Sequence, residues 1–368
     1  MTIFPLIMAG GPGSRLWPES RRSRPKPFLP LLPDGRSLFR ATLDRVAPLA
    51  LQGGPLVAIG ASLAELALAQ APELEPERLL REPSPRDTAL CAAWASLEVL
   101  RLDPDAALLV LPSDHLVEPD ETFRETIRLG AEFLRERPDE LVVFGIEPRF
   151  ASTAYGYVER GENLGVEIYR VARFREKPNL ATATEFLQTG RFFWNAGIFL
   201  WRAETYLRLL EKFEPEFAPI LRTMRDKIDA ARARGERPDD DPEFARAFSS
   251  AKRISIDRAV LERAESVAVV RANKFAWSDL GSFGALEETD RREEKRTNSP
   301  RRGIVIEENS FRNLVRVRDP EKLVALVDVD DLLIVETPDA LLVAKNGSDD
   351  GIKRLVKRLG KEGLDSYL

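Results

Sequence analysis

The sequence of 368 residues contains only one histidine, His115, and one cysteine, Cys91. A Ser-His-Asp triad could be built only around His115, and these two residues are too few ligands for a zinc site of cysteine and histidine. A single cysteine forms no disulfide within the chain, which suits a reducing cytoplasm. Any catalysis must therefore use carboxylates, lysine, arginine, backbone amides or a metal ion that prefers oxygen ligands.

The chain also lacks a strong charge of either sign and a long apolar run. It carries 60 acidic and 55 basic residues, a net charge of −5, and so offers no basic field to a nucleic-acid backbone. No run approaches about 18 apolar residues, and residues 1–11 lack the basic start of a signal peptide. We expect a soluble, cytoplasmic protein that binds neither nucleic acid nor a membrane.

Short apolar runs alternate with helical patterns in the N-terminal half. Continuous apolar strands separated by helices are typical of an α/β fold with a mainly parallel sheet flanked by helices. The predicted strands are 3–9, 55–60, 107–111 and 141–146, and the predicted helices are 37–47, 63–71, 88–102 and 121–136.

From about residue 155 the pattern changes to strands that lie close together in the sequence. We predict strands at 156–160, 167–174 and 197–201 and a helix at 180–189. The strongly charged stretch 226–243 predicts a solvated helix-loop excursion.

A second charged stretch, 290–302, has almost no apolar residues and predicts a linker. It divides the chain into a catalytic domain at 1–290 and a small β domain at 291–368, which ends in an amphipathic helix. The β domain shows no clear fixed-period repeat, so the sequence leaves open whether it forms a closed β-helix or a flat sheet. Its five strand-like runs are 303–307, 314–318, 323–329, 332–336 and 341–344.

A glycine-rich segment, Gly10-Gly11-Pro12-Gly13-Ser14, directly follows the first predicted strand. Glycines allow backbone N–H groups to turn toward an anion, although the same residues fit an ordinary strand-to-helix turn. The segment matches neither the P-loop nor the dinucleotide fingerprint. The P-loop ends in Gly-Lys-Ser/Thr, but here Ser14 and Arg15 follow the last glycine. The dinucleotide fingerprint needs a third glycine where this chain has Leu16. Arg15, followed eleven residues later by Lys26, provides the fixed cations that a polyphosphate requires.

Asp114 comes at the carboxyl end of the predicted strand 107–111, the edge at which open parallel sheets bind ligands. A carboxylate there could hold Mg²⁺, which takes one or two carboxylates and leaves its other positions to phosphate and water. Asp114 could equally cap the turn that follows. We interpret the neighbouring His115 as a hydrogen-bonded structural residue and not as a catalyst.

Together, the segments 10–18 and 25–29 resemble the signature of the sugar-nucleotide pyrophosphorylases, and within them most of all the mannose-1-phosphate guanylyltransferases. The resemblance implies a Rossmann-like nucleotidyltransferase fold followed by a β-helix-like appendage. It implies that Arg15 and Lys26 are catalytic and that the glycine-rich segment binds the nucleotide. It also implies that Asp114 and the late Asp279 together hold Mg²⁺.

Three further motifs, each weak alone, resemble the family's sugar-binding segments. Residues 153–158 resemble the strand that approaches the hexose, with Tyr155 and Gly156 at its centre. Glu176 and Lys177 match a Glu-Lys-Pro motif whose lysine binds the sugar phosphate, and Asn195 matches an amide that binds sugar hydroxyls.

Residues 82–89 resemble the family's loop beside the nucleotide base, which implies roles for Glu82, Asp87 and Thr88. A carboxylate from Glu82 or Asp87 could accept from the N–H donors of guanine. Asp87 and Thr88 could also simply cap the helix that follows. The chain departs from the family at Asp87 for asparagine, Pro27 for glutamine and Ala154 for glycine, and these departures bear on fine specificity more than on reaction class.

We therefore expect a monofunctional homodimeric enzyme that transfers a guanylyl group from GTP to α-D-mannose 1-phosphate. It is expected to be monofunctional because the chain stops before the extra C-terminal cupin domain of some relatives could fit. The alternatives are a hexose-1-phosphate nucleotidyltransferase that uses UTP or dTTP, a non-catalytic regulatory homologue, and a Rossmann dehydrogenase, against which Leu16 argues.

Overall fold

The computed structural model describes residues 1–11, 13–32, 34–50, 54–289 and 303–368. They group into two compact units. Unit 1 comprises residues 1–10, 42–113 and 117–277, and unit 2 comprises residues 11–41, 114–116 and 278–368. The predicted linker 290–302 and the domain boundary at residue 290 lie outside the described residues.

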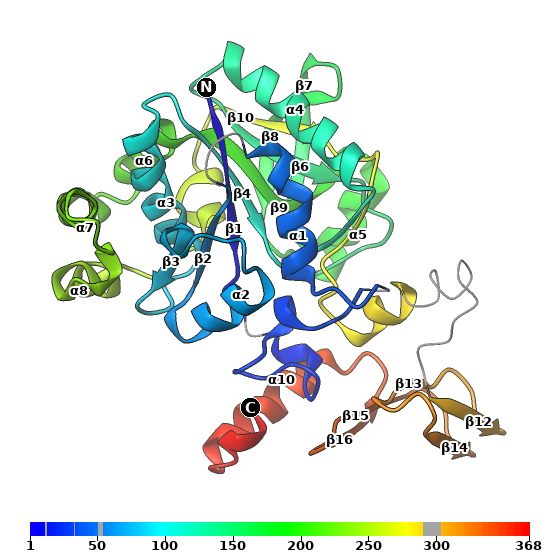
Figure 1. The fold of residues 1–368 in the computed structure, drawn as a ribbon. Helices are drawn as coiled ribbons and strands as arrows, with labels where there is room; N and C mark the ends of the chain where they lie inside the picture. The colour runs from blue at the N-terminus through cyan, green and yellow to red at the C-terminus, as the bar shows by residue number, and fades with distance from the viewer. Residues whose placement is uncertain (12, 33, 51–53, 290–302) are drawn as a thin grey trace. The chain divides into compact units, whose positions relative to one another are not determined.

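Unit 1 is built on one mixed sheet of nine strands (Figure 1). In spatial order its strands are β3 (Leu79–Glu82), β2 (Leu56–Gly60), β1 (Ile3–Met8), β4 (Ala107–Pro112), β9 (Phe192–Arg202), β6 (Leu141–Ile146), β10 (Val267–Arg271), β8 (Ile168–Arg175) and β7 (Tyr157–Gly165).

Seven of the nine strands run in the same direction, as expected of a mainly parallel sheet, and β8 and β9 run against them. β1 pairs in parallel with β2 and β4, and β10 pairs in parallel with β6. β9 runs antiparallel between β4 and β6, and β8 runs antiparallel to β10 and β7. β7 also pairs with β9. One part of the sheet therefore closes into a ring of five strands, β9, β6, β10, β8 and β7. The predicted α/β class is confirmed.

The first four helices of unit 1 alternate with strands, as expected, and its last three helices follow one another directly. α3 has buried side chains from Ala89 to Val99 because its sequence is apolar on every side, so it lies inside the core. The helices are α1 (Leu38–Val46, whose first residues belong to unit 2), α2 (Ala64–Gln70), α3 (Thr88–Leu102), α4 (Asp120–Glu136), α5 (Leu180–Thr189), α6 (Ala203–Phe213), α7 (Phe217–Ala233) and α8 (Pro242–Ser250).

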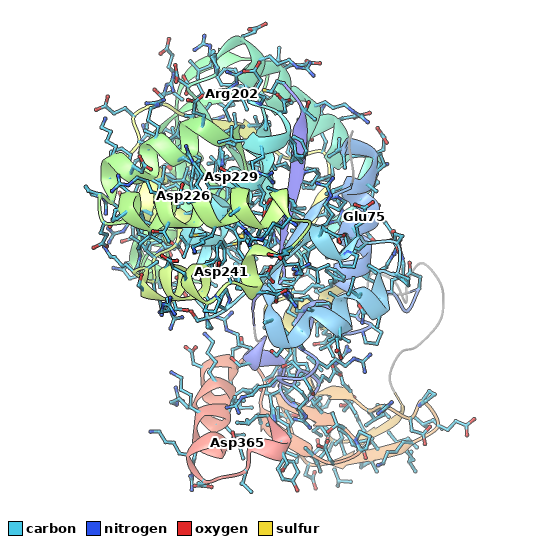
Figure 2. The ribbon with its side chains drawn as sticks, turned by 60° about the vertical axis from the view of Figure 1, so that its left-hand side comes forward. Glu75, Arg202, Asp226, Asp229, Asp241 and Asp365 are labelled. Carbon is cyan, nitrogen blue, oxygen red and sulfur yellow. The ribbon has the colours of Figure 1, made fainter. Side chains whose placement is uncertain are left out.

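The charged stretch 226–243 contains the helix and the loop that we predicted, and many of its charged side chains are exposed. It spans the end of α7 and the start of α8, and α7 packs Leu221, Met224 and Ile228 into the core. Figure 2 shows Asp226 and Asp229 on α7, and Asp229 accepts a 2.8 Å hydrogen bond from Arg101 of α3. The charges thus lie on one face of helices whose other face is buried.

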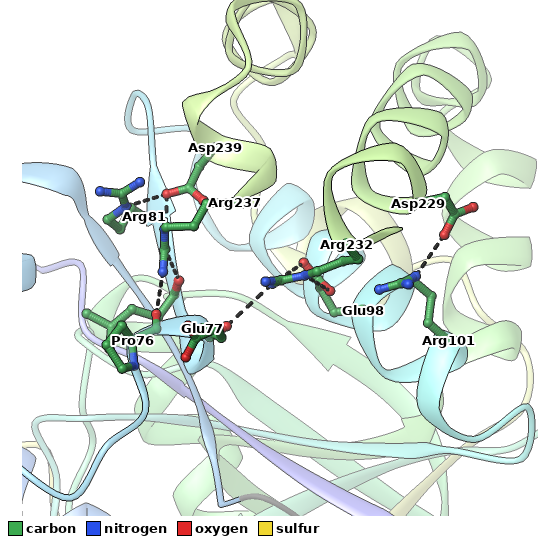
Figure 3. A network of polar contacts seen from close by, with 10 residues as sticks. Pro76, Glu77, Arg81, Glu98, Arg101, Asp229, Arg232, Arg237 and Asp239 are labelled. Carbon is green, nitrogen blue, oxygen red and sulfur yellow. Dashed lines mark hydrogen bonds and ion pairs between the residues drawn. The ribbon is translucent and has the colours of Figure 1, made fainter. Parts of the chain in front are cut away.

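Ion pairs fix the turn between α7 and α8 to the edge of the sheet (Figure 3). The side chain of Asp239 is only 3% exposed and accepts from Arg81 of β3 and from Arg237. Arg232 of α7 pairs with Glu98 of α3 at 2.9 Å. The Arg81–Asp239 pair thus holds the strand that ends at Glu82, and the Arg232–Glu98 pair joins α7 to α3.

The C-terminal part of unit 2 stacks two coils of chain with a period of 19 residues. It contains the strands β12 (Ile304–Glu308), β13 (Leu314–Arg316), β14 (Leu323–Val327), β15 (Leu332–Glu336) and β16 (Leu341–Lys345), and the helix α10 (Asp349–Lys361). β12 pairs in parallel with β14, and β13 with β15, each residue with the one 19 positions later.

The corners of the two coils repeat as well. Asn309 and Asp328 both have positive φ, 47° and 54°, and so do Arg312 and Asp331, with 57° and 56°. Hydrogen bonds join these corners from one coil to the next, including Asn309 to Asp328 at 2.6 Å and Arg312 to Asp331 at 2.7 Å. A period that was not visible in the sequence is therefore present, and the strands stack as a β-helix, as the resemblance implied.

In unit 2 the glycine-rich segment and the C-terminal part share one core. Leu16 and Trp17 belong to the same apolar cluster as Leu333, Val335 and Ile352. Trp17 Nε1 donates to the backbone oxygen of Tyr367 at 2.7 Å. Within the described ranges, no helix is long and apolar enough to cross a membrane.

Candidate functional site

A cavity of about 250 Å³ lies within unit 2. Its walls come from the glycine-rich segment, from the 3₁₀ turn Lys26–Phe28, from the residues after β4, from the residues after β11 (Ala276–Ser278) and from α10. The lining residues are Gly13, Ser14, Arg15, Leu16, Lys26, Asp114, His115, Asp279, Gly281 and Lys353.

The glycine-rich segment turns at Gly13, which has a positive φ of 60°. Its carbonyl oxygen accepts from Leu16 N at 2.9 Å and from Ser20 Oγ at 2.7 Å. A Cβ atom at position 13 would lie 2.5 Å from Lys26 Cβ. Glycine is therefore required both for the backbone conformation and for the close approach of Lys26.

Lys26 is buried, with 4% of its surface exposed. Its Nζ donates to Asp114 Oδ2 at 2.8 Å and to the backbone oxygen of Asp279. The structure thus brings together three of the predicted residues, from positions far apart in the sequence.

The carboxyl group of Asp114 is held in its charged form. Burial alone would raise its pKa, but the nearby charges of Lys26 and His115 outweigh burial and lower the pKa below its usual value. His115 Nε2 lies 3.8 Å from Asp114 Oδ1.

Asp114 and Asp279 line the same cavity and provide oxygen ligands. No group of three or more acidic, histidine or cysteine residues suited to a metal occurs in the part of the chain that the structure describes. Two carboxylates fit Mg²⁺, which typically takes one or two from the protein and the rest from phosphate and water.

Arg15 and Lys353 supply two further cations to the walls of the cavity. Lys353 was not predicted, because it lies in the C-terminal helix and in no recognisable motif. The charge of Arg15 also acts on Asp349, the first residue of α10. Burial raises the pKa of Asp349, and the charge of Arg15 opposes this shift without cancelling it.

Of the other predicted residues, Gly11 lies in unit 2 outside the lining of the cavity, and the rest lie in unit 1. Glu82 ends β3, and its Oε1 atom is buried without a hydrogen-bond partner among the described residues. Burial raises the pKa of Glu82 to about 7, assisted by the charge of Asp87 and opposed by a hydrogen bond with Cys91. A Cβ atom on Gly10 would lie 3.9 Å from Glu82 Oε2, so this carboxyl group faces the backbone after β1.

The loop from Glu82 to Thr88 is held by α8 and the residues after it. Ser84 Oγ is 2.9 Å from Ser249 Oγ, and Arg86 donates to the backbone oxygen of Ser249. Thr88 Oγ1 accepts from Ile256 N at 2.9 Å, and Asp87 caps α3 by accepting from Thr88 N at 2.9 Å. The capping role that we considered for Asp87 is therefore present.

The sugar-side motifs converge on Gly156. Its backbone oxygen accepts from Asn195 N at 2.8 Å, and a Cβ atom on Gly156 would lie 2.6 Å from Glu176 Oε2. The ring of Tyr155 makes edge contacts with Trp194 and Trp277 at centroid distances of 5.0 and 5.3 Å.

Asp257 joins this cluster and was not assigned a role from the sequence. Asn195 Nδ2 donates to Asp257 Oδ1 at 2.9 Å. Burial, and then the negative charge of Glu176, raise the pKa of Asp257 to about 6. Lys177 pairs with Glu176 at 2.6 Å, and its side chain is 60% exposed.

Two family profiles match the chain. The profile described as nucleotidyl transferase matches residues 4–296, and the one described as MannoseP isomerase/GMP-like beta-helix domain matches residues 303–359. The second match agrees with the stacked coils of unit 2.

Curated relatives match along nearly the whole chain. A mannose-1-phosphate guanylyltransferase of Sinorhizobium fredii is 37% identical over 98% of this chain and 68% of its own length. One from Escherichia coli is 34% identical over 99% of this chain and 75% of its own. A crystal structure from Thermus thermophilus, described as a mannose-1-phosphate geranyltransferase, is 33% identical, covers 98% of this chain and 100% of its own, and has a TM-score of 0.78.

Proposed function

The chain belongs to the mannose-1-phosphate guanylyltransferase family of nucleotidyltransferases, and on this basis we propose how its residues carry out the reaction. The enzyme transfers a guanylyl group from GTP to α-D-mannose 1-phosphate and gives GDP-mannose and pyrophosphate. The observation that carries the residue assignments is the cavity in which Arg15, Lys26, Asp114 and Asp279 meet. A non-catalytic homologue would have no need to keep all four.

The nucleophile needs no general base. The second pKa of a phosphate monoester is about 6, so mannose 1-phosphate is already ionised at neutral pH. Its oxygen attacks the α-phosphorus of GTP. The bond from that phosphorus to the oxygen that bridges to the β-phosphate breaks, and the electron pair leaves with pyrophosphate. Catalysis is then mainly positioning and charge stabilisation.

The cations of the cavity have separate roles in this mechanism. Arg15 neutralises the pyrophosphate leaving group, and its guanidinium suits the two-point contacts that phosphate oxygens offer. Lys26 contacts the phosphates near the reacting phosphorus. Its hydrogen bonds to Asp114 and to the backbone oxygen of Asp279 hold it there. The absence of a Cβ atom at Gly13 leaves room for its side chain. The glycine-rich backbone of Gly10, Gly11, Gly13 and Ser14 binds the nucleotide.

Asp114 and Asp279 would hold Mg²⁺, which would stabilise the negative charge of the phosphate oxygens. The lowered pKa of Asp114 supports this role, since a metal ligand must be deprotonated.

The residues of unit 1 select the base and the sugar. Glu82, with Asp87 and Thr88 beside it, accepts from the N–H donors of guanine. Lys177 binds the sugar phosphate, while Tyr155, Gly156, Glu176 and Asn195 contact the hexose. The alternative nucleotides UTP and dTTP present a different edge to Glu82.

The catalytic assignment is tested by Lys26→Ala together with metal removal. We expect Lys26→Ala to lower kcat by orders of magnitude while the protein stays folded, and Lys357→Ala, an exposed lysine of α10, to leave kcat unchanged. EDTA should abolish activity and added Mg²⁺ should restore it. Near-normal turnover of Lys26→Ala, or full activity in EDTA, would contradict the corresponding assignment.

We also propose that the protein is a cytoplasmic homodimer. Its single cysteine, Cys91, is free and buried, which agrees with a reducing compartment. β12 and β14 expose Ile304, Ile306, Leu323 and Val327 on one side of their sheet, each 54–58% exposed. An apolar strip of this kind is typical of a surface that binds another chain.

A further inference from the structure

Building on the proposed function, we propose that Lys353 of α10 is a binding residue for the β- and γ-phosphates of GTP and for the pyrophosphate product. Lys353 lines the same cavity as Arg15 and Lys26, although 327 residues separate it from Lys26 in the sequence. The C-terminal helix therefore contributes directly to the phosphate site.

The packing of α10 explains why Lys353 faces the cavity. The preceding residue, Ile352, is 2% exposed and belongs to the apolar cluster that also contains Leu16 and Trp17 of the glycine-rich segment. Trp17 and Arg21 both donate to the backbone oxygen of Tyr367, beyond the end of α10, at 2.7 and 2.9 Å. The helix and the glycine-rich segment are thus held together within unit 2.

The charge balance of the cavity depends on Lys353. Without it, the lining cations Arg15 and Lys26 equal the two carboxylates Asp114 and Asp279, and Lys26 is already paired with Asp114. Lys353 makes the lining net positive. A polyphosphate carries several negative charges, and Lys353 adds one positive charge to those that would face them.

The ammonium group of Lys353 is available to a ligand. Its ion pair, with Asp350 Oδ1 of the same helix, is 3.8 Å long, and the Asp350 side chain is 83% exposed. Exposed pairs of this length stabilise little and exchange readily for a stronger partner. Lys353 itself is 38% exposed, so a ligand in the cavity can reach it.

The size of the cavity favours a polyphosphate over a whole nucleotide. Its volume of about 250 Å³ is below the roughly 300–1,000 Å³ of sites that enclose a drug-sized ligand. The cavity is also lined mainly by charged and small residues, and the imidazole of His115 is the one aromatic ring among its lining residues. It therefore suits the phosphate end of the nucleotide.

The test compares Lys353→Ala with its matched control Lys357→Ala, an exposed lysine one turn further along α10. Isothermal titration with pyrophosphate in the presence of Mg²⁺ should show about tenfold weaker binding to Lys353→Ala, the scale of one charge-assisted hydrogen bond. Lys357→Ala should bind as the wild type does, and Lys353→Arg should keep most of the affinity. Circular dichroism and thermal unfolding show that each variant is folded.

Steady-state kinetics separate this role from a structural one. Lys353→Ala should raise the KM for GTP, and for pyrophosphate in the reverse reaction, about tenfold, and should leave the KM for mannose 1-phosphate within about twofold. Equal pyrophosphate affinity of Lys353→Ala and Lys357→Ala would overturn the inference. If the wild type makes no GDP-mannose but Lys353→Ala still loses pyrophosphate affinity, the proposed function fails and the phosphate site stands.

Discussion

Gly13→Ala is the substitution for which the structure predicts the sharpest effect. The backbone at position 13 has a φ of 60°, a left-handed conformation that costs a residue with a Cβ about 1–2 kcal/mol. The new Cβ would also lie 2.5 Å from Lys26 Cβ, whereas carbon atoms rest at about 3.5–4.0 Å. Lys26 must therefore move by about 1 Å, and overpacking of this kind typically costs about 1–3 kcal/mol.

Together these effects predict that Gly13→Ala lowers the free energy of unfolding by about 2–5 kcal/mol. A displacement of about 1 Å at Lys26 should also lower kcat about 100-fold. Gly35→Ala is the matched control: Gly35 has a φ of 78°, but nothing lies within 4 Å of its added Cβ. It tests the backbone strain alone, and we expect its kcat to be normal.

The measurement is urea unfolding together with steady-state kinetics on the wild type and both variants. If Gly13→Ala matches Gly35→Ala in both unfolding midpoint and kcat, the close approach of Gly13 to Lys26 has no role in the site. The reasoning from this contact would then be refuted.

Two further predictions concern pH and assembly. Because the pKa of Glu82 is raised to about 7 in the folded chain, its protonated form adds stability that is complete below pH 4.5 and is lost as pH rises through 7. In urea unfolding, Glu82→Gln should therefore be more stable than the wild type by about 3 kcal/mol at pH 8 and similar to it at pH 4.5. Equal stability of the two proteins at pH 8 would contradict the raised pKa. Light scattering should give twice the chain mass of 41.4 kDa, and Ile306→Asp, but not the control Val166→Asp, should lower it. A wild-type monomer would contradict the dimer.

The sequence predicted those elements of the fold whose local patterns are strong. α3 and α5 begin and end at the predicted residues, because Asp87 and Asn179 cap them and both have a continuous or amphipathic apolar pattern. β10 was missed although it lies inside the sheet, because a five-residue apolar run does not distinguish a strand from a buried helix.

The 19-residue repeat was missed for a different reason. It is defined by backbone conformation at the corners, where Asn309 aligns with Asp328 and Arg312 with Asp331, so the repeated residues are mostly not identical. The period becomes visible only when the left-handed corners and the strand register are known.

The same distinction applies to the site. Residues inside a recognisable motif, such as Arg15 and Lys26, could be named from the sequence. Lys353 could not, because only folding brings it to the cavity that Arg15 lines. No local pattern marks a lone lysine on a helix as a ligand for phosphate.

The central claim, guanylyl transfer to mannose 1-phosphate, is tested most directly by a substrate panel on the purified protein. GTP, UTP and dTTP would each be paired with mannose 1-phosphate and with glucose 1-phosphate, and release of pyrophosphate and formation of the nucleotide sugar would be measured. We expect the highest kcat/KM for GTP with mannose 1-phosphate and GDP-mannose as the product. A higher kcat/KM with UTP or dTTP, or no turnover with any pair, would contradict the claim.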